Sequence, residues 1–164
     1  MSKDGRKPGS IAVQSPPVRE RAVPGVEQGR APYGPVAAFA GDPVDIIRNM
    51  RNGTPADIVP GLAVRLGITQ DGLFRLLRLP HSTMKARISK NDTLSSSEQD
   101  RLYRTEKVLA RALAVLEDNA SAKAWLVQNN RSLGGEAPLS LLDTEAGYEL
   151  VLDTLGRIEY GIVA

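Results

Sequence analysis

The 164-residue sequence contains no cysteine, a single histidine and few aromatic residues. The absence of cysteine excludes disulfide bonds, thiolate metal ligands and a cysteine nucleophile. His81 alone cannot build a histidine-rich metal site, and no glycine-rich phosphate loop accompanies it. Because aromatic residues make up only 4% of the chain, the core must consist of Leu, Val, Ile and Ala. We therefore predict no metal site, no cofactor and no catalytic residues.

Long hydrophobic runs are also missing, and so is the apolar region of a signal peptide. We expect a soluble, cytoplasmic protein without a membrane partner. The net charge is only +2, but it is unevenly distributed. Residues 75–111 hold nine Lys/Arg against four Asp/Glu, whereas residues 112–164 hold three against eight. A basic middle and an acidic end indicate two partners, phosphate for the first and a basic protein surface or a cationic pocket for the second. The alternative is that neither patch is contiguous in the folded chain.

Residues 70–90 predict two short helices joined by a tight turn. Leucines at helical spacing give the first helix one apolar face, and Thr69 is its expected N-cap. Pro80 prevents the helix from continuing. Ser82 is the expected N-cap of the second helix, because its hydroxyl can accept an otherwise unpaired backbone N–H. Two short helices connected in this way form a helix-turn-helix.

The second of these helices is predicted to expose a cationic, hydroxyl-bearing face. Met84 and Ile88 are four residues apart and are expected to point inward. A short helix of this kind, braced by the preceding helix, suits the major groove of DNA. A solvated basic helix in an all-helical core is the alternative. The predicted DNA-binding residues are Ser82, Thr83, Lys85, Arg87 and Lys90.

Capping residues mark the other helix starts. Within the first helix, Val44, Ile47 and Met50 are expected to lie on one side. Gly147 lies inside the last helix, where a glycine permits close approach of another backbone; a neutral glycine without such a contact is the alternative. The expected starts are Asp42-Pro43, Thr54-Pro55, the capping box of Ser95 and Glu98, Asn119 or Ser121, and Thr144.

The chain divides into three regions by composition. Residues 1–42 contain six prolines and six glycines, which predicts a flexible basic tail in which only the apolar stretch 32–40 is able to dock on the body. Residues 43–117 are expected to form the helix-turn-helix, DNA-binding and dimerisation region. Residues 118–164 are expected to form a small helical C-terminal domain. Because no stretch alternates with the period of a strand, the predicted fold class is all-α.

The order of the motifs resembles a known family. The helix-turn-helix is followed by L-S-S-S-E-Q-D-R-L-Y-R at 94–104 and by N-R-S-L-G-G-E-A-P-L-S-L-L-D-T-E-A-G at 130–147. The sequence L-G-R-I-E-Y-G follows at 155–161. Together these motifs resemble the Xre-type antitoxins of the MbcA/ParS/Xre family, which are partners of RES-domain toxins. The resemblance covers about residues 44–164.

The resemblance implies a homodimer that represses its own operon by binding operator double-stranded DNA with the second helix of the helix-turn-helix. It also implies a C-terminal region that covers the active site of an NAD-consuming RES-domain toxin. The residues that take the toxin-binding role by this resemblance are Gly134, Gly135, Arg157, Ile158, Glu159, Tyr160 and Gly161.

The end of the chain also suits this role on physical grounds. A toxin that binds a dinucleotide pyrophosphate needs cations in its cleft, and Glu159 is expected to pair with them. Ile158, Tyr160 and Ile162 are expected to fill the apolar parts of the same cleft, as a segment that extends and orders on binding. A frayed terminus with Ile158 packed on its own core is the alternative.

Two other functions compete with this interpretation. Glu145, Glu149 and Asp153 recur every four residues and form a carboxylate stripe that an enzyme could use. No histidine, cysteine or phosphate loop completes such a site, so we predict that the chain is not an enzyme. The second alternative is a stand-alone helix-turn-helix repressor without a toxin partner.

Overall fold

The computed structural model describes residues 36–162, so most of the predicted N-terminal tail and the last two residues lie outside the described residues. The described chain is helical, which confirms the all-α fold class; the strand-like pairing within it consists of two isolated bridges. None of the helices in this part of the chain is long and apolar enough to cross a membrane. The elements are η1 (Ala37–Phe39), α1 (Pro43–Asn52), α2 (Ile58–Leu66), α3 (Gln70–Leu76), α4 (His81–Lys90), α5 (Ser96–Leu116), α6 (Asn119–Val127), η2 (Arg131–Leu133), η3 (Pro138–Leu141) and α7 (Glu145–Glu159), where η denotes a 3-10 turn.

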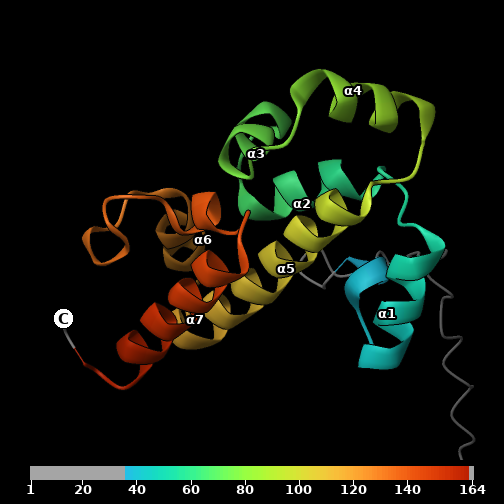
Figure 1. Cartoon of the computed structure of the whole chain (residues 1–164). Helices are drawn as coiled ribbons and strands as arrows, with labels where there is room; N and C mark the ends of the chain where they lie inside the picture. Colours follow the sequence, from blue (N-terminus) through green and yellow to red (C-terminus); the bar gives the residue numbers. More distant parts are fainter. Residues whose placement is uncertain (1–35, 163–164) are drawn as a thin grey trace, which may run out of the picture. The chain divides into compact units, whose positions relative to one another are not determined.

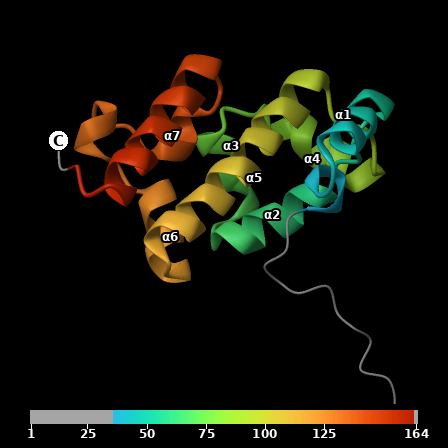
Figure 2. The ribbon, with the colours of Figure 1, turned by 90° about the horizontal axis from the view of Figure 1, so that it is seen from below.

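The 21-residue helix α5 is the spine of the fold. Helices α2, α3 and α4 gather around its first half, and α6 and α7 pack along its second half (Figures 1 and 2). Its deeply buried apolar side chains are Leu102, Val108, Leu109 and Ala112. A single core runs beneath both halves; it is mostly aliphatic, as the scarcity of aromatic residues predicted, but it also contains Phe39, Phe74 and Met84.

Four predicted helix starts are confirmed by their capping bonds. The Asp42 carboxylate accepts the backbone N–H of Val44 at 2.8 Å. The Thr69 hydroxyl accepts from Gly72 N, and the Thr144 hydroxyl from Gly147 N, each at 3.0 Å. Ser95 and Glu98 complete the predicted capping box. These helices begin where local sequence places an acceptor for the unpaired N–H groups.

Three predicted starts are wrong. Thr54 is buried and donates to Gln99 Oε1 at 2.8 Å, and α2 begins only at Ile58. Helix α4 begins at His81 after Pro80, so Ser82 lies within its first turn. Helix α6 is capped by Asp118, one residue before Asn119. Hydrogen bonds from the hydroxyl and the backbone N–H of Ser121 lower the pKa of Asp118.

Helix α1 packs on the core through Ile46 and, in part, Met50. Ile46 is buried, whereas Val44 and Ile47 are 61% and 47% exposed. The segment before the helix, residues 36–42, falls within the predicted flexible tail. Its Phe39 is instead buried, with its ring edge against Tyr103 at a centroid distance of 5.7 Å. Val36 and Ala38 also pack against the core, so the described part of the apolar stretch, residues 36–40, docks on the body.

Candidate functional site

The turn between α3 and α4 is tightly anchored. Phe74 and Met84 are fully buried and hold the two helices to the core. Arg78 adopts a left-handed conformation in the turn, with φ of 52°. The Arg101 guanidinium on α5 donates to the carbonyls of Leu77 at 3.3 Å and Arg78 at 2.9 Å. The spine helix therefore fixes the direction in which α4 projects.

The exposed face of α4 has short side chains in its middle and cations at its rims. Ser82, Ala86 and Ser89 are exposed and lie on one line along the helix, at spacings of four and three residues. Thr83 and Lys90 are exposed on one side of this line, and Lys85 is exposed on the other. The structure thus brings four of the five predicted DNA-binding residues onto one accessible surface: Ser82, Thr83, Lys85 and Lys90.

Lys85 is paired with the beginning of α3. Its Nζ lies 3.0 Å from Asp71 Oδ1, and His81 Nδ1 lies 3.6 Å from the same oxygen. The hydrogen bond from Lys85, and then its positive charge, lower the pKa of the Asp71 carboxyl. This exposed cluster orients Lys85 along the junction of α3 and α4.

Arg87 does not point outward, and that part of the prediction is wrong. Its guanidinium donates to the Thr93 carbonyl, and its Nε lies 3.6 Å from Glu98 Oε2. The side chain is only 28% exposed, because position 87 lies on the flank of α4 facing the start of α5. Arg87 therefore holds the end of α4 to the capping box of α5.

The end of α7 forms a closed cap and is not extended, contrary to the expectation. Ile162 N donates to the Arg157 carbonyl at 2.9 Å, and Gly161 N donates to the Ile158 carbonyl at 3.1 Å. This pair of bonds is a Schellman motif, which requires a left-handed residue after the helix. Gly161 supplies it, with φ of 65°.

The capped end exposes apolar side chains and binds its own acidic residue. Ile158, Tyr160 and Ile162 are 38%, 77% and 60% exposed. Glu159 forms a two-pronged ion pair with Arg111 of α5. Arg111 Nη1 donates to Glu159 Oε1 at 3.2 Å, and Arg111 Nη2 donates to Glu159 Oε2 at 2.5 Å. The carboxylate that we expected to meet cations of a partner is thus engaged within the chain.

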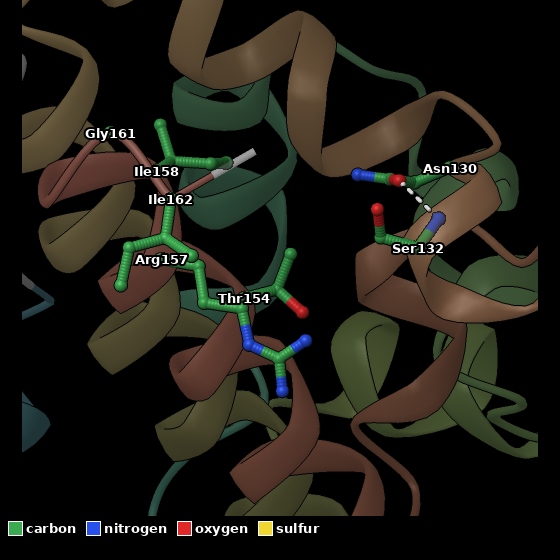
Figure 3. A pocket seen from close by; sticks show the side chains of 7 residues that line it. All are labelled: Asn130, Ser132, Thr154, Arg157, Ile158, Gly161 and Ile162. Carbon is green, nitrogen blue, oxygen red and sulfur yellow. Dashed lines mark hydrogen bonds between the residues drawn. The ribbon is translucent and has the colours of Figure 1, made fainter. Parts of the chain in front are cut away.

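Beside this end lies a hollow of about 240 Å³. Ile158 and Ile162 form its apolar wall, and Asn130 and Ser132 of the loop between α6 and α7 face them (Figure 3). The remaining lining residues are Thr154, Arg157 and Gly161.

Asn130, Ser132 and Thr154 were not predicted from the sequence, because nothing local shows that residues 130–132 meet the end of the last helix. The two glycines of this loop that we predicted to bind the toxin do not line the hollow. Gly134 and Gly135 are exposed with φ of 70° and 83°, and they turn the chain without lining the hollow.

Together these features describe a helix-turn-helix protein with a second helical domain that ends in an exposed apolar surface. Residues 45–104 match the model of the antitoxin Xre-like helix-turn-helix domain. Residues 111–161 match the model of the antitoxin Xre/MbcA/ParS C-terminal toxin-binding domain. The chain therefore belongs to the Xre/MbcA/ParS antitoxin family. It is an antitoxin and not an enzyme, with a DNA-binding domain of the helix-turn-helix type and a C-terminal domain that binds a toxin, as predicted.

Similar proteins come from several bacteria. The chain is 26% identical over 146 residues to the Prs ADP-ribosylating antitoxin of Sphingobium sp. (strain YBL2), covering 84% of this chain and 92% of that protein. It is 34% identical over 83 residues to antitoxin Xre of Pseudomonas putida, covering 51% and 52%. It is also 25% identical over 118 residues to antitoxin Xre of Yersinia enterocolitica, covering 71% and 80%.

Proposed function

We propose that this antitoxin neutralises a RES-domain, NAD-consuming toxin by covering the toxin's active site with its C-terminal region. We further propose that it acts in the cytoplasm as a homodimer and represses its own operon by binding operator DNA with α4. In this proposal residues 43–117 bind DNA and dimerise, and residues 118–164 bind the toxin. The observation that carries the toxin half is the exposed apolar end of α7 within the matched toxin-binding domain.

Three large apolar side chains are exposed within five residues, at Ile158, Tyr160 and Ile162. Scattered exposed apolar residues are ordinary, but a rimmed cluster marks a surface that another protein covers. Tyrosine is also enriched among the residues that dominate binding energies. The acidic charge of the surrounding domain suits a toxin whose cleft attracts a pyrophosphate.

A charge placed at Tyr160 tests the toxin half. We expect Tyr160→Asp to weaken binding to a RES-domain toxin from the same operon by about thirtyfold, the effect of losing an interface hot spot. Calorimetric titration measures the affinity, and rescue of toxin-expressing cells measures neutralisation. Val64→Asp is the matched control, because Val64 on α2 has the same 77% exposure.

Equal rescue by Tyr160→Asp and the unchanged chain would show that this surface is not the inhibitory one. If the unchanged chain binds no RES-domain protein, the proposed type of toxin is wrong. A purified chain that binds its promoter DNA but no toxin would favour the stand-alone repressor.

The repressor half rests on the shape and charge of α4. Short side chains along its middle allow close approach to base edges, where Ser and Thr hydroxyls bind either donors or acceptors. Lys85 and Lys90 at the rims lie where the phosphates of the two strands pass. Arg87 is engaged by Thr93 and Glu98, so we remove it from the proposed DNA-binding residues.

Loss of one rim cation tests this assignment. We expect Lys90→Ala to bind the promoter fragment of its own operon about tenfold more weakly at low salt, and to make the slope of log affinity against log salt shallower by about one. Fluorescence anisotropy across a salt series measures both quantities. Lys107→Ala on α5 removes another exposed charge away from α4 and should change neither. An unchanged salt slope for Lys90→Ala would contradict the proposed orientation of α4.

A further inference from the structure

We propose that the hollow at the end of α7 receives a side chain of the toxin, one that is apolar and lies next to a hydrogen-bond acceptor. This inference rests on the proposed function, because it names what the toxin contributes at the same surface. In this arrangement a side chain of the toxin inserts into the hollow of the antitoxin at the centre of the contact. The end of α7 then forms one wall of a pocket that receives the toxin side chain, in addition to covering the toxin's active site.

The backbone cap of α7 builds the apolar wall of the hollow. The two Schellman hydrogen bonds turn the chain back at Gly161, which places Ile162 beside Ile158 on the hollow (Figure 3). Such a wall exists before any partner arrives, because it is fixed by backbone bonds. Preformed walls reduce the entropy lost on binding.

The opposite side supplies a free hydrogen-bond donor. Asn130 Oδ1 accepts the backbone N–H of Ser132 at 2.9 Å, which assigns the amide orientation and leaves Nδ2 as a donor toward the hollow (Figure 3). Within residues 36–162 this Nδ2 makes no hydrogen bond. Thr154, in contrast, already donates to the Leu150 carbonyl at 2.8 Å.

A cationic side chain, Arg157, also lines the hollow, and the Ser132 hydroxyl can either donate or accept. Arg157 pairs with Asp153 at 2.7 Å on the outer edge and adds positive charge there. A partner that places an apolar group between the isoleucines and a carbonyl or carboxylate oxygen near Asn130 satisfies both sides. Beside Asn130 Nδ2 and Arg157, a cationic or donor group of the partner would meet donors, whereas an acceptor oxygen would be bound by them.

The size of the hollow favours a protein side chain over a metabolite. Its volume of about 240 Å³ lies below the ~300–1,000 Å³ of sites that enclose small molecules. All but one of its lining residues lie within residues 111–161, the matched toxin-binding domain. The toxin is therefore the partner that this position points to.

Filling the hollow tests the proposal directly. Ser132 is exposed and its hydroxyl is not needed by the loop, so Ser132→Leu should fold normally while occupying the hollow. We expect this variant to bind the RES-domain toxin at least thirtyfold more weakly, with an unchanged thermal midpoint. Ala120→Leu adds an apolar side chain at an exposed position of α6 that does not line the hollow, and should bind as the unchanged chain does. Binding of Ser132→Leu within threefold of the unchanged chain would overturn the proposal.

A thiol at the same place reports occupancy without blocking it. Because the chain has no cysteine, Ser132→Cys carries its only thiol. We expect iodoacetamide to alkylate it rapidly in the free antitoxin and at least thirtyfold more slowly in the toxin complex, as followed by mass spectrometry of the intact chain. Ala120→Cys should react equally fast in both states. A Ser132→Cys thiol that is already protected in the free chain would show that the chain's own end fills the hollow, and would also overturn the proposal.

The proposed function and the hollow assignment fail separately. If the unchanged chain forms no complex with a RES-domain toxin, the proposed function fails before the hollow is tested. If the complex forms, while Ser132→Cys stays reactive in it and Ser132→Leu binds normally, the toxin contacts another surface and only the hollow assignment is wrong.

Discussion

Replacing Gly147 with alanine should lower the free energy of unfolding by about 3 kcal/mol or more, because the new methyl group collides with backbone. A Cβ at this position would lie 1.9 Å from the Leu141 carbonyl oxygen and 2.8 Å from its carbonyl carbon. A flexible side chain could move aside, but Leu141 belongs to η3 and its backbone can yield only if the loop separates from α7. Urea unfolding of the whole chain measures the effect.

The sign of the change in unfolding free energy for Gly147→Ala distinguishes a packing effect from an effect of helix propensity. Alanine is favoured over glycine by roughly 1 kcal/mol inside a helix, so propensity alone predicts stabilisation. Gly156 lies on the same helix, and a Cβ added there would have no neighbouring atom within 4 Å. Gly156→Ala should therefore gain up to about 1 kcal/mol while Gly147→Ala loses stability. A gain at both positions would mean that η3 does not touch α7.

The Gly147 contact also bears on function. At this contact the loop of residues 130–142 packs closely against α7. The hollow lies between the start of that loop and the end of the same helix. The place of Gly147 inside a predicted helix was enough to predict a close approach there. It was not enough to identify Leu141 as the partner, because the two residues meet only after the loop has folded back.

Helix starts show where local sequence is sufficient. Asp42, Thr69, Ser95 and Thr144 each cap the helix that immediately follows, so the information lies within four residues. Thr54 has the same local signature, yet its hydroxyl is used by Gln99, 45 residues away. A local rule cannot detect such competition.

Some functional residues were likewise predictable from local sequence, whereas others depend on residues distant in the chain. The predicted helix-turn-helix, the exposure of Lys85 and Lys90 and the apolar end of α7 follow from helical periodicity. The inward turn of Arg87 depends on Thr93 and Glu98, whose position is set by the path between two helices.

The hollow depends on tertiary packing in the same way. It joins residues 130–132 to residues 154–162, so no sequence window contains it. The family resemblance identified the region but not this geometry.

A buried ion pair connects α2 to the spine helix α5 and should produce the second large effect. Arg65 of α2 donates to Glu106 of α5, and the two side chains are only 12% and 4% exposed. The second carboxylate oxygen of Glu106 has no partner within the part of the chain that the structure describes. Removing Arg65 leaves a buried charge without compensation, which costs about 3–5 kcal/mol.

We therefore expect Arg65→Ala to lose about 3–5 kcal/mol of unfolding free energy, measured by urea titration. Arg48→Ala is the matched control, because its pair with Asp45 is 63% and 57% exposed and such pairs contribute about 0–1 kcal/mol. The double variant Arg65→Met with Glu106→Leu should recover most of the loss, since well-packed apolar residues replace a buried pair at little cost. If the double variant is as unstable as Arg65→Ala, the pair acts through specific geometry between α2 and α5, and operator affinity should fall with it. If it recovers both stability and operator affinity, the pair stabilises the junction only by keeping its charges compensated.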